Sequence, residues 1–256
     1  MVDIDILLHG IPGRTNQGYL SYASAAMVDR RAVVDVGSLA RRPILEETLE
    51  SAGIDVDDVE DVLLTHLHYD HCDNADLFPN ATVHVYEAEY RRVDDGEYDW
   101  ATPRNATAML ADLEVEFFDI GDEVAGMEVV HTPGHVEHHV GFIAEGDGLT
   151  FGLTGDAMKN VQEVETMDPM VFYDEAVAVE TMQWIADRVD FVVPGHDTPF
   201  YVSDDGRPIP AVDVELGVNL QLSGTNATTN HISTSRGDLR PLPDNVTDLA
   251  VKQDLP

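Results

Sequence analysis

The hexapeptide HLHYDH at residues 66–71 directly follows the apolar run VLL and a threonine. It places three imidazoles and one carboxylate within six residues, a pattern typical of metal binding. The apolar run predicts a buried strand whose carboxyl end points at a site. Because alternate residues of an extended chain share a face, His66 and His68 can aim at one point. Asp70 and His71 follow the bend and can aim at a second point nearby. The alternative is a solvated histidine-rich loop.

Three further apolar runs end in turns of the same kind. Residues 127–130 lead to HTPGH, residues 149–153 lead to TGD, and residues 191–193 lead to PGH. Each run predicts a strand followed by a glycine-containing turn, in which the glycine lets the backbone bend sharply or approach a metal. The side chains that these turns present are His131, His135, Asp156 and His196. Together with HLHYDH, the chain thus has four apolar runs that each end in a turn with histidine or aspartate, which favours a metal centre over a histidine-rich loop.

The order HxHxDH, GH, GD and GH, over about residues 1–202, resembles the metallo-β-lactamase-fold superfamily of metal hydrolases. The resemblance implies an α/β fold, a four-layer αββα sandwich with helices outside two sheets. The ligand set that it implies has one metal held by His66, His68 and His135, and a second held by Asp70, His71 and His196. Asp156 would bridge both metals.

Several histidines lie outside this pattern. In the glyoxalase-II-like branch the second motif often reads GHTxGH; here Val136 and His138 replace its threonine and inner glycine, and His139 matches its last histidine. This departure leaves the ligands in place but argues against glyoxalase II chemistry. We expect His131 and His139 to orient ligands, although His131, His138 or His139 could take the place of His135 as a ligand. The histidines without a metal-binding pattern are His9, His84 and His231.

The resemblance and the donor set together predict metal-assisted hydrolysis. A hydroxide held between the two metals attacks a carbonyl whose oxygen one metal polarises. Asp70 or Asp156 accepts a proton or orients the nucleophile. Imidazole-rich sites with a little carboxylate suit zinc, so we expect two zinc ions per chain, while iron or manganese would also fit. The expected substrates are small esters, thioesters or lactones.

Two other functions remain open. Persulfide dioxygenases of the same superfamily carry similar motifs but use a single iron. A group of metallo-β-lactamase-domain proteins that act on RNA resembles the segment VDFVVPGHDTPFYV. The flavodiiron redox branch is disfavoured because no glutamate replaces His68, and a metal-free binding module is disfavoured because every ligand position holds a ligating residue.

The charge of the chain is strongly acidic. It has 14 basic and 49 acidic residues, a formal net charge of -35, and its only lysines are Lys159 and Lys252. Self-repulsion of this size destabilises a compact fold unless counterions screen it, so we interpret the acidity as adaptation to high salt in a halophilic organism. An acidic interaction face or an acidic tail is the alternative, but the acids are spread along the chain. Few cations are present to neutralise phosphates, which disfavours nucleic acid as a partner.

Location and redox state follow from what the sequence lacks. No apolar run approaches the roughly 20 residues that span a membrane. The first residues carry neither a basic segment nor an apolar signal core, so we expect a cytoplasmic protein. The single Cys72 excludes an internal disulfide, and we interpret it as a small filler of the histidine loop.

Outside the motifs, periodicity predicts a regular alternation of strands and helices. We expect strands at residues 3–9, 20–28 and 32–36, with a turn at residues 10–13. A helix with a proline start and a glycine stop is expected at residues 43–52, and a second amphipathic helix at residues 174–188.

We place a catalytic domain at residues 1–202 and a C-terminal extension at residues 203–256. Strict alternation of apolar and polar residues from 212 to 222 predicts a strand within the extension. One face of that strand has to be buried, on the core or against another subunit, because an exposed apolar edge invites aggregation. We favour subunit pairing, as a homodimer or larger assembly; a disordered acidic tail is the alternative.

Overall fold

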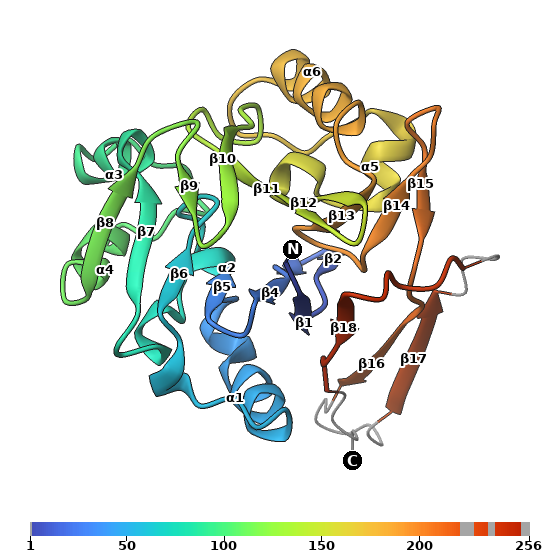
Figure 1. Cartoon of the computed structure of the whole chain (residues 1–256), viewed down its shortest axis with the longest axis horizontal. Coiled ribbons are helices and arrows are strands. Elements are labelled where there is room, and N and C mark those ends of the chain that lie inside the picture. Colours follow the sequence, from blue (N-terminus) through green and yellow to red (C-terminus); the bar gives the residue numbers. More distant parts are fainter. Residues whose placement is uncertain (1, 221–227, 235–238, 252–256) are drawn as a thin grey trace.

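The computed structural model describes residues 2–220, 228–234 and 239–251. Most of its strands belong to two seven-stranded sheets. Figure 1 shows the sheets as neighbouring layers, with helices α1, α3 and α4 outside the first sheet and α5 and α6 outside the second. The predicted four-layer αββα sandwich is confirmed.

The first sheet has the strand order β18-β1-β4-β5-β6-β7-β8. Its strands are β1 (Ile4–Leu8), β4 (Ala25–Val28), β5 (Ala32–Val34), β6 (Asp61–Leu63), β7 (Thr82–Tyr86), β8 (Glu114–Phe118) and β18 (Val246–Asp248). The second sheet has the order β15-β14-β13-β12-β11-β10-β9. Its strands are β9 (Glu123–Val124), β10 (Met127–His131), β11 (Val140–Gly146), β12 (Leu149–Gly155), β13 (Phe191–Pro194), β14 (Phe200–Val202) and β15 (Pro208–Pro210).

Two strand pairs and several helices complete the described chain. The pairs are β2 (Ile11–Thr15) with β3 (Gly18–Tyr22), and β16 (Val214–Leu220) with β17 (Thr228–Thr234). The α-helices are α1 (Arg42–Ser51), α2 (Tyr69–Cys72), α3 (Glu87–Asp94), α4 (Ala106–Leu110), α5 (Val161–Thr166) and α6 (Glu175–Ala186). The short 3-10 helices are η1 (Leu39–Arg41), η2 (Val56–Asp58), η3 (Ala75–Leu77) and η4 (Asp156–Met158).

The space between the sheets is filled by alternate side chains of facing strands. Ile4 and Ile6 of β1 lie in this inner core, as do Phe191 and Val193 of β13. The intervening Val192 packs outward, in the cluster that contains residues of α5 and α6. Central strands are therefore buried on both faces, which explains why their sequences are continuous apolar runs.

The two long predicted helices form with the expected end signals. Helix α1 has Pro43 in its first turn, and Gly53 follows its end with a left-handed φ of 66°. Helix α6 is capped by the Asp174 side chain, which accepts a hydrogen bond from the Val177 backbone N–H at 3.0 Å. The buried apolar residues of these helices are Leu45, Leu49, Ala178, Met182 and Ile185.

The N-terminal strands differ from the prediction. Residues 20–28 form parts of two strands, β3 and β4, and strand β2, at residues 11–15, takes up most of the turn expected at residues 10–13. Between β3 and β4 the Ser24 N–H donates to the Gly195 carbonyl at 2.7 Å, which fixes the chain against the turn after β13 and ends the first strand. Pro12 is tolerated in β2 because this strand pairs on one edge only. The outcome is a β2–β3 hairpin separate from both sheets.

The C-terminal region returns to the core. Strand β15 pairs with β14, and β18 runs parallel to β1, so each sheet receives an edge strand from beyond residue 202. Strand β16 lies within the predicted 212–222 strand, whose last two residues fall outside the described part, and it pairs with β17 of the same chain. The division at residue 202 and the pairing of subunits stay predictions.

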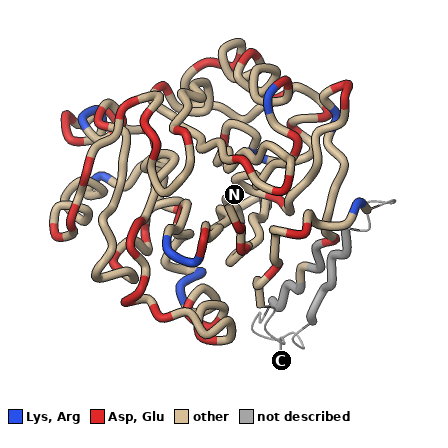
Figure 2. Tube along the Cα trace, in the orientation of Figure 1, with Lys and Arg blue, Asp and Glu red and all other residues tan. Residues whose placement is uncertain are grey.

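Figure 2 shows acidic residues on elements throughout the molecule and few basic ones. The acidic residues are therefore distributed over the molecule, as their positions in the sequence indicate, and are not grouped as they would be in an acidic tail. Among residues 2–220, 228–234 and 239–251, no helix combines the length and apolar character needed to cross a bilayer.

Candidate metal centre

The motif residues meet where strands of both sheets end. Strand β6 leads into the HLHYDH loop, and the turn between β10 and β11 carries His135. Strands β12 and β13 run parallel, so Asp156 and His196, which follow them, emerge at the same edge. The seven residues predicted as ligands are all buried, namely His66, His68, Asp70, His71, His135, Asp156 and His196.

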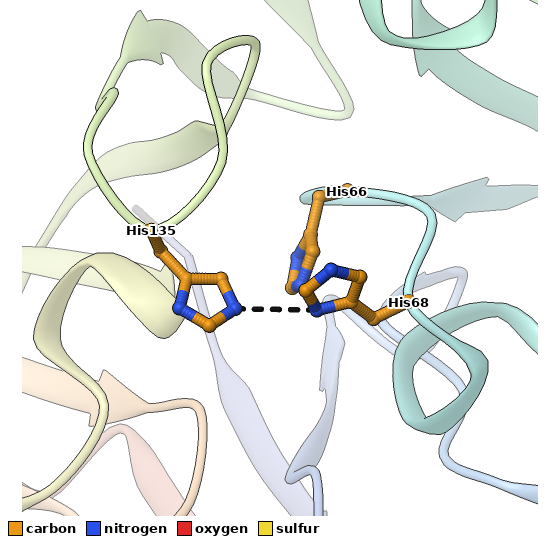
Figure 3. A group of neighbouring side chains, drawn as sticks. All are labelled: His66, His68 and His135. Atoms are coloured by element: carbon orange, nitrogen blue, oxygen red, sulfur yellow. Dashed lines mark hydrogen bonds between the residues drawn. The ribbon is translucent and has the colours of Figure 1, made fainter. Parts of the chain in front are cut away.

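Three histidines form the first group of potential ligands. One ring nitrogen of each of His66, His68 and His135 lies within 4.8 Å of the others. The Nε2 atom of His135 is 3.2 Å from Nδ1 of His68. Figure 3 shows His66 and His68 reaching in from one loop and His135 from the facing turn. The arrangement offers three imidazole nitrogens to a single ion.

A second group contains Asp70, His71 and His196, whose ligand atoms also lie within 4.8 Å of one another. Asp156 stands between the two groups. Its Oδ1 atom is 3.2 Å from Nε2 of His71 and 3.1 Å from Nε2 of His196. Its Oδ2 atom is 3.1 Å from Nε2 of His135 in the first group. One carboxylate therefore touches both groups, one oxygen on each side.

The ring nitrogens that face away from the centre are held by other protein atoms. Nδ1 of His71 shares a hydrogen bond of 2.7 Å with Oδ2 of Asp35. The corresponding partners are Thr65 Oγ1 for His66, Asp99 Oδ2 for His68, the Met170 carbonyl for His135 and Ser21 Oγ for His196. Such outer partners fix the ring orientation of metal-binding histidines. Each of the five rings is thereby left with its other nitrogen directed inward.

The inward atoms have unmet hydrogen-bonding capacity. Nε2 of His66, His71 and His196 and Oδ1 of Asp156 are buried and have no hydrogen-bond partner, so the close approaches of Oδ1 to His71 and His196 lack hydrogen-bond geometry. A buried polar atom without a partner costs about 1–3 kcal/mol. Bound metal ions would satisfy these atoms, and a set of imidazoles with two carboxylates fits zinc, iron or manganese.

Burial and neighbouring charges decide which imidazoles carry protons. Burial lowers the pKa of His66 and of His135 well below the ordinary value, so both rings are neutral near pH 7, as metal ligation requires. Burial alone would lower the pKa of His71 too, but the carboxylates of Asp35 and Asp156 outweigh it and raise that pKa. A metal ion at His71 would take the place of this proton.

Two glycines allow the turns to come this close. A Cβ on Gly195 would collide with Oδ1 of Asp156. Gly155 has a left-handed φ of 47°, and a Cβ there would lie 2.7 Å from Oγ1 of Thr65. The glycines of the TGD and PGH turns are therefore required by packing at the centre.

The histidines outside the ligand set support the loops. His139 is buried; its Nδ1 bonds the Thr132 hydroxyl, and its Nε2 accepts the backbone N–H of Asp156 at 3.2 Å, which fits the expected orienting role. His131 is exposed, and its Nε2 lies 3.2 Å from the Glu137 carbonyl, so it holds its own turn. The histidines bonded to carboxylates elsewhere are His9, with Asp248, and His84, with Asp61.

Three supporting residues were missed from the sequence. Asp35 directly follows the buried strand β5, and besides binding His71 it accepts the Thr65 N–H at 2.9 Å; a carboxylate after an apolar run was the available signal. Lys159 follows the TGD turn and was noted only as a rare lysine. Asp99, which bonds His68, lies in a polar loop that carries no signal.

Lys159 and Asp156 form a buried ion pair, with Nζ donating to Oδ2 at 2.8 Å. Burial would lower the pKa of Lys159, but the Asp156 carboxylate outweighs it and raises that pKa. For Asp156, burial would raise the pKa, but His196 and Lys159 together hold it well below its usual range. Both members of the pair are therefore charged near pH 7.

A cavity of about 890 Å³ opens beside the centre. The β2–β3 hairpin lines one side, and Asp197 with residues from 159–170 and 208–210 lines the rest. A narrower space of about 20 Å³ adjoins the ligands themselves. The residues that line both spaces are Tyr19, Ser21, Lys159 and Met170. Trp100, which is 61% exposed and stacks on Tyr19 with the ring centroids 5.1 Å apart, also lines the narrower space.

Comparison with known proteins agrees with this geometry. The family described as the metallo-beta-lactamase superfamily matches residues 22–196, more than half of the chain. Metallo-beta-lactamase domain-containing protein 1 of Xenopus laevis is 29% identical over 179 residues, which cover 68% of this chain and 70% of the relative. An N-acyl homoserine lactonase of a Bacillus species is 26% identical over 156 residues, which cover 58% of this chain and 60% of the lactonase.

Solved structures share the same fold. A dizinc quorum-quenching lactonase in complex with a product superposes with a TM-score of 0.61 at 18% identity, covering 76% of this chain and 81% of that one. At this level of identity the likeness concerns the fold.

Proposed function

This chain belongs to the metallo-beta-lactamase superfamily of metal-dependent hydrolases, and we propose that it is a dinuclear enzyme acting on a small ester, thioester or lactone. The observation that carries the proposal is the pair of three-ligand groups joined by Asp156, with buried inward atoms that lack partners. In this assignment His66, His68 and His135 would hold one metal, Asp70, His71 and His196 would hold the other, and Asp156 would contact both.

The metals would supply Lewis acidity and a water molecule that ionises near neutral pH. The chain's own residues provide the rest. Asp35 and the other outer partners keep the imidazoles oriented, so that ligation needs no rearrangement. Asp70 and Asp156, the carboxylates of the centre, accept a proton from the attacking water or orient it. The adjoining cavity gives room for a small acyl substrate.

Zinc is the proposed metal because five of the seven ligands are imidazoles. The lactonase relative supports acyl substrates. A polyanionic substrate such as RNA fits less well, because Glu165, Asp168 and Asp197 all line the cavity. These carboxylates would repel phosphates.

The acid-rich surface supports a protein adapted to a salt-rich cytoplasm. Assembly into a homodimer or larger oligomer also belongs to this proposal. Its support is the ribbon of β16 and β17, which pairs with neither main sheet among the described strands and so keeps edges for another subunit.

Metal analysis and a substrate panel test the proposal. The protein is stripped with chelator, reloaded with zinc, iron or manganese, and assayed in molar potassium chloride on lactones, thioesters, 4-nitrophenyl esters and single-stranded RNA. We expect two metal ions per chain and hydrolysis of at least one acyl substrate, lost on chelation. One iron per chain with oxygen consumption on a persulfide would instead indicate a dioxygenase, and cleavage of RNA alone would indicate a nuclease.

A further inference from the structure

Lys159 is placed unlike the other cations of this chain. Within residues 2–220, 228–234 and 239–251 it is the only lysine or arginine that is buried, and it is 8% exposed. It lies one turn beyond Asp156, just after η4, and its Nζ atom is 2.8 Å from Oδ2 of that carboxylate. Burying an ammonium is costly, so a specific partner has to compensate it.

Lys159 borders both the metal centre and the cavity. Its side chain lines the narrow space next to His68, Asp70 and Asp156, and it also lines the cavity of about 890 Å³. A substrate that extends from the cavity to the ligands would therefore lie beside the side chain of Lys159.

A counter-ion role toward Asp156 does not account for this placement once metals are bound. Two divalent cations at the centre would carry more charge than the carboxylates of Asp70 and Asp156 together, so the ammonium of Lys159 would be repelled unless a further anion were present. An ammonium has three donors, and Asp156 takes one of them. The other donors suit an oxygen that arrives with the substrate and becomes negative during the reaction.

We propose that Lys159 is a catalytic residue whose ammonium binds the carbonyl oxygen of the acyl substrate and stabilises the charge that forms on it. The inference rests on the proposed hydrolase function. Water oxygen bonds to the carbonyl carbon, its proton passes to a carboxylate of the centre, and the carbonyl π pair moves onto the oxygen that Lys159 holds. When the carbonyl re-forms, the bond to the alkoxide or thiolate breaks, and the leaving group takes the proton.

Three variants test this role in kinetics. Lys159→Met removes the charge, Lys159→Arg keeps it, and Lys252→Met changes the chain's only other lysine and serves as the matched control. With 4-nitrophenyl butyrate and metal content verified for each protein, we expect Lys159→Met to lower kcat by about 100- to 1000-fold. We expect KM to change little, Lys159→Arg to recover part of kcat, and Lys252→Met to match the unchanged protein.

Two results in these assays would overturn the inference. Either Lys159→Met holds both metals and keeps kcat within about threefold, or it fails to hold the metals, which would make Lys159 a structural counter-ion of Asp156. The threefold limit is small beside the expected loss of an oxyanion donor.

A binding measurement separates this inference from the proposed function. Butylphosphonate carries a tetrahedral anionic group that resembles an attacked acyl carbonyl, and calorimetry gives its affinity for the metal-loaded proteins without any turnover. We expect Lys159→Met to bind it at least about tenfold more weakly, the effect of losing a hydrogen bond to a charged group. If the unchanged protein hydrolyses no ester, thioester or lactone but shows this dependence, the proposed function fails and the Lys159 site stands. If the unchanged protein hydrolyses an acyl substrate but Lys159→Met binds butylphosphonate as tightly as the unchanged protein does, the proposed function stands and the inference about Lys159 fails.

Discussion

The metal centre and the surface of this protein use charge in opposite ways. At the centre, buried imidazoles, carboxylates and Lys159 contact one another at about hydrogen-bond distance, and the ammonium of Lys159 is paired with the carboxylate of Asp156. On the surface, acidic residues spread over all parts of the chain with few cations among them, for a net charge of -35. The centre is organised by short contacts, while the surface is dominated by repulsion.

The difference teaches where each kind of electrostatic effect should be seen. Buried contacts act in a medium of low dielectric and are screened little by salt, whereas repulsion between exposed charges fades within a Debye length. Changes at the centre should therefore alter metal content and activity at any salt concentration. The surface should make stability depend on salt.

The largest effect is expected for Asp156→Ala. Asp156 contacts both ligand groups, through Oδ1 on one side and Oδ2 on the other, so its loss removes the charge that holds two cations together. We expect loss of one or both metals and of nearly all hydrolytic activity, measured by elemental analysis and assay in high salt. Full metal content with normal turnover would break the dinuclear reading.

A paired substitution tests the histidine assignment. His135 is buried with Nε2 pointing at the centre, while His131, four residues earlier, is exposed and bonds a carbonyl of its own turn. We expect His135→Asn to lose at least one metal and His131→Asn to keep both. Equal metal loss in the two variants would contradict the assignment of His135, and not His131, as the metal ligand of this turn.

A smaller effect is expected from the outer partner of His71. Asp35 and Asp61 each bond a histidine at 2.7 Å, but only Asp35 supports a residue of the centre. Asp35→Asn should weaken metal binding by about 10- to 100-fold, the usual cost of removing such a partner. Asp61→Asn is the matched control and should leave the metal affinity unchanged. Competition with a chromophoric chelator measures both, and equal affinities would contradict the role of Asp35.

The smallest effect per residue is the effect of salt on the stability of the fold, to which charges over the whole surface contribute. Repulsion between exposed charges reaches about 10 Å at 0.1 M salt and about 3 Å at 1 M, so screening should stabilise the fold. We expect the melting temperature to rise between low and molar potassium chloride, measured by circular dichroism. Asp156→Ala should show the same rise, since it lies at the centre. A flat or falling curve for the unchanged protein would mean that the surface charge does not limit stability.

Much of the centre was predictable because its signals are local. An apolar run followed at once by HLHYDH, HTPGH, TGD or PGH marks a strand end with a polar turn, and each signal lies within about ten residues. The hairpin of β2 and β3 was missed because Pro12 and Gly13 look like breakers, and only the contact between Ser24 and Gly195 shows where the strand must end. Asp99 was missed because its partner His68 is distant in sequence.

By itself, the sequence determined the charge, the α/β alternation and the order of the ligand-bearing turns, because strand burial and turn chemistry depend on neighbouring residues, while the four layers came from the resemblance to the superfamily. Tertiary structure alone decided which atoms meet. The placement of Asp35 behind His71, of Asp156 between two ligand groups, and of Lys159 between the centre and the cavity depends on how two sheets pack. Contacts between residues far apart in the chain leave no periodic pattern, so they have to be read from the folded molecule.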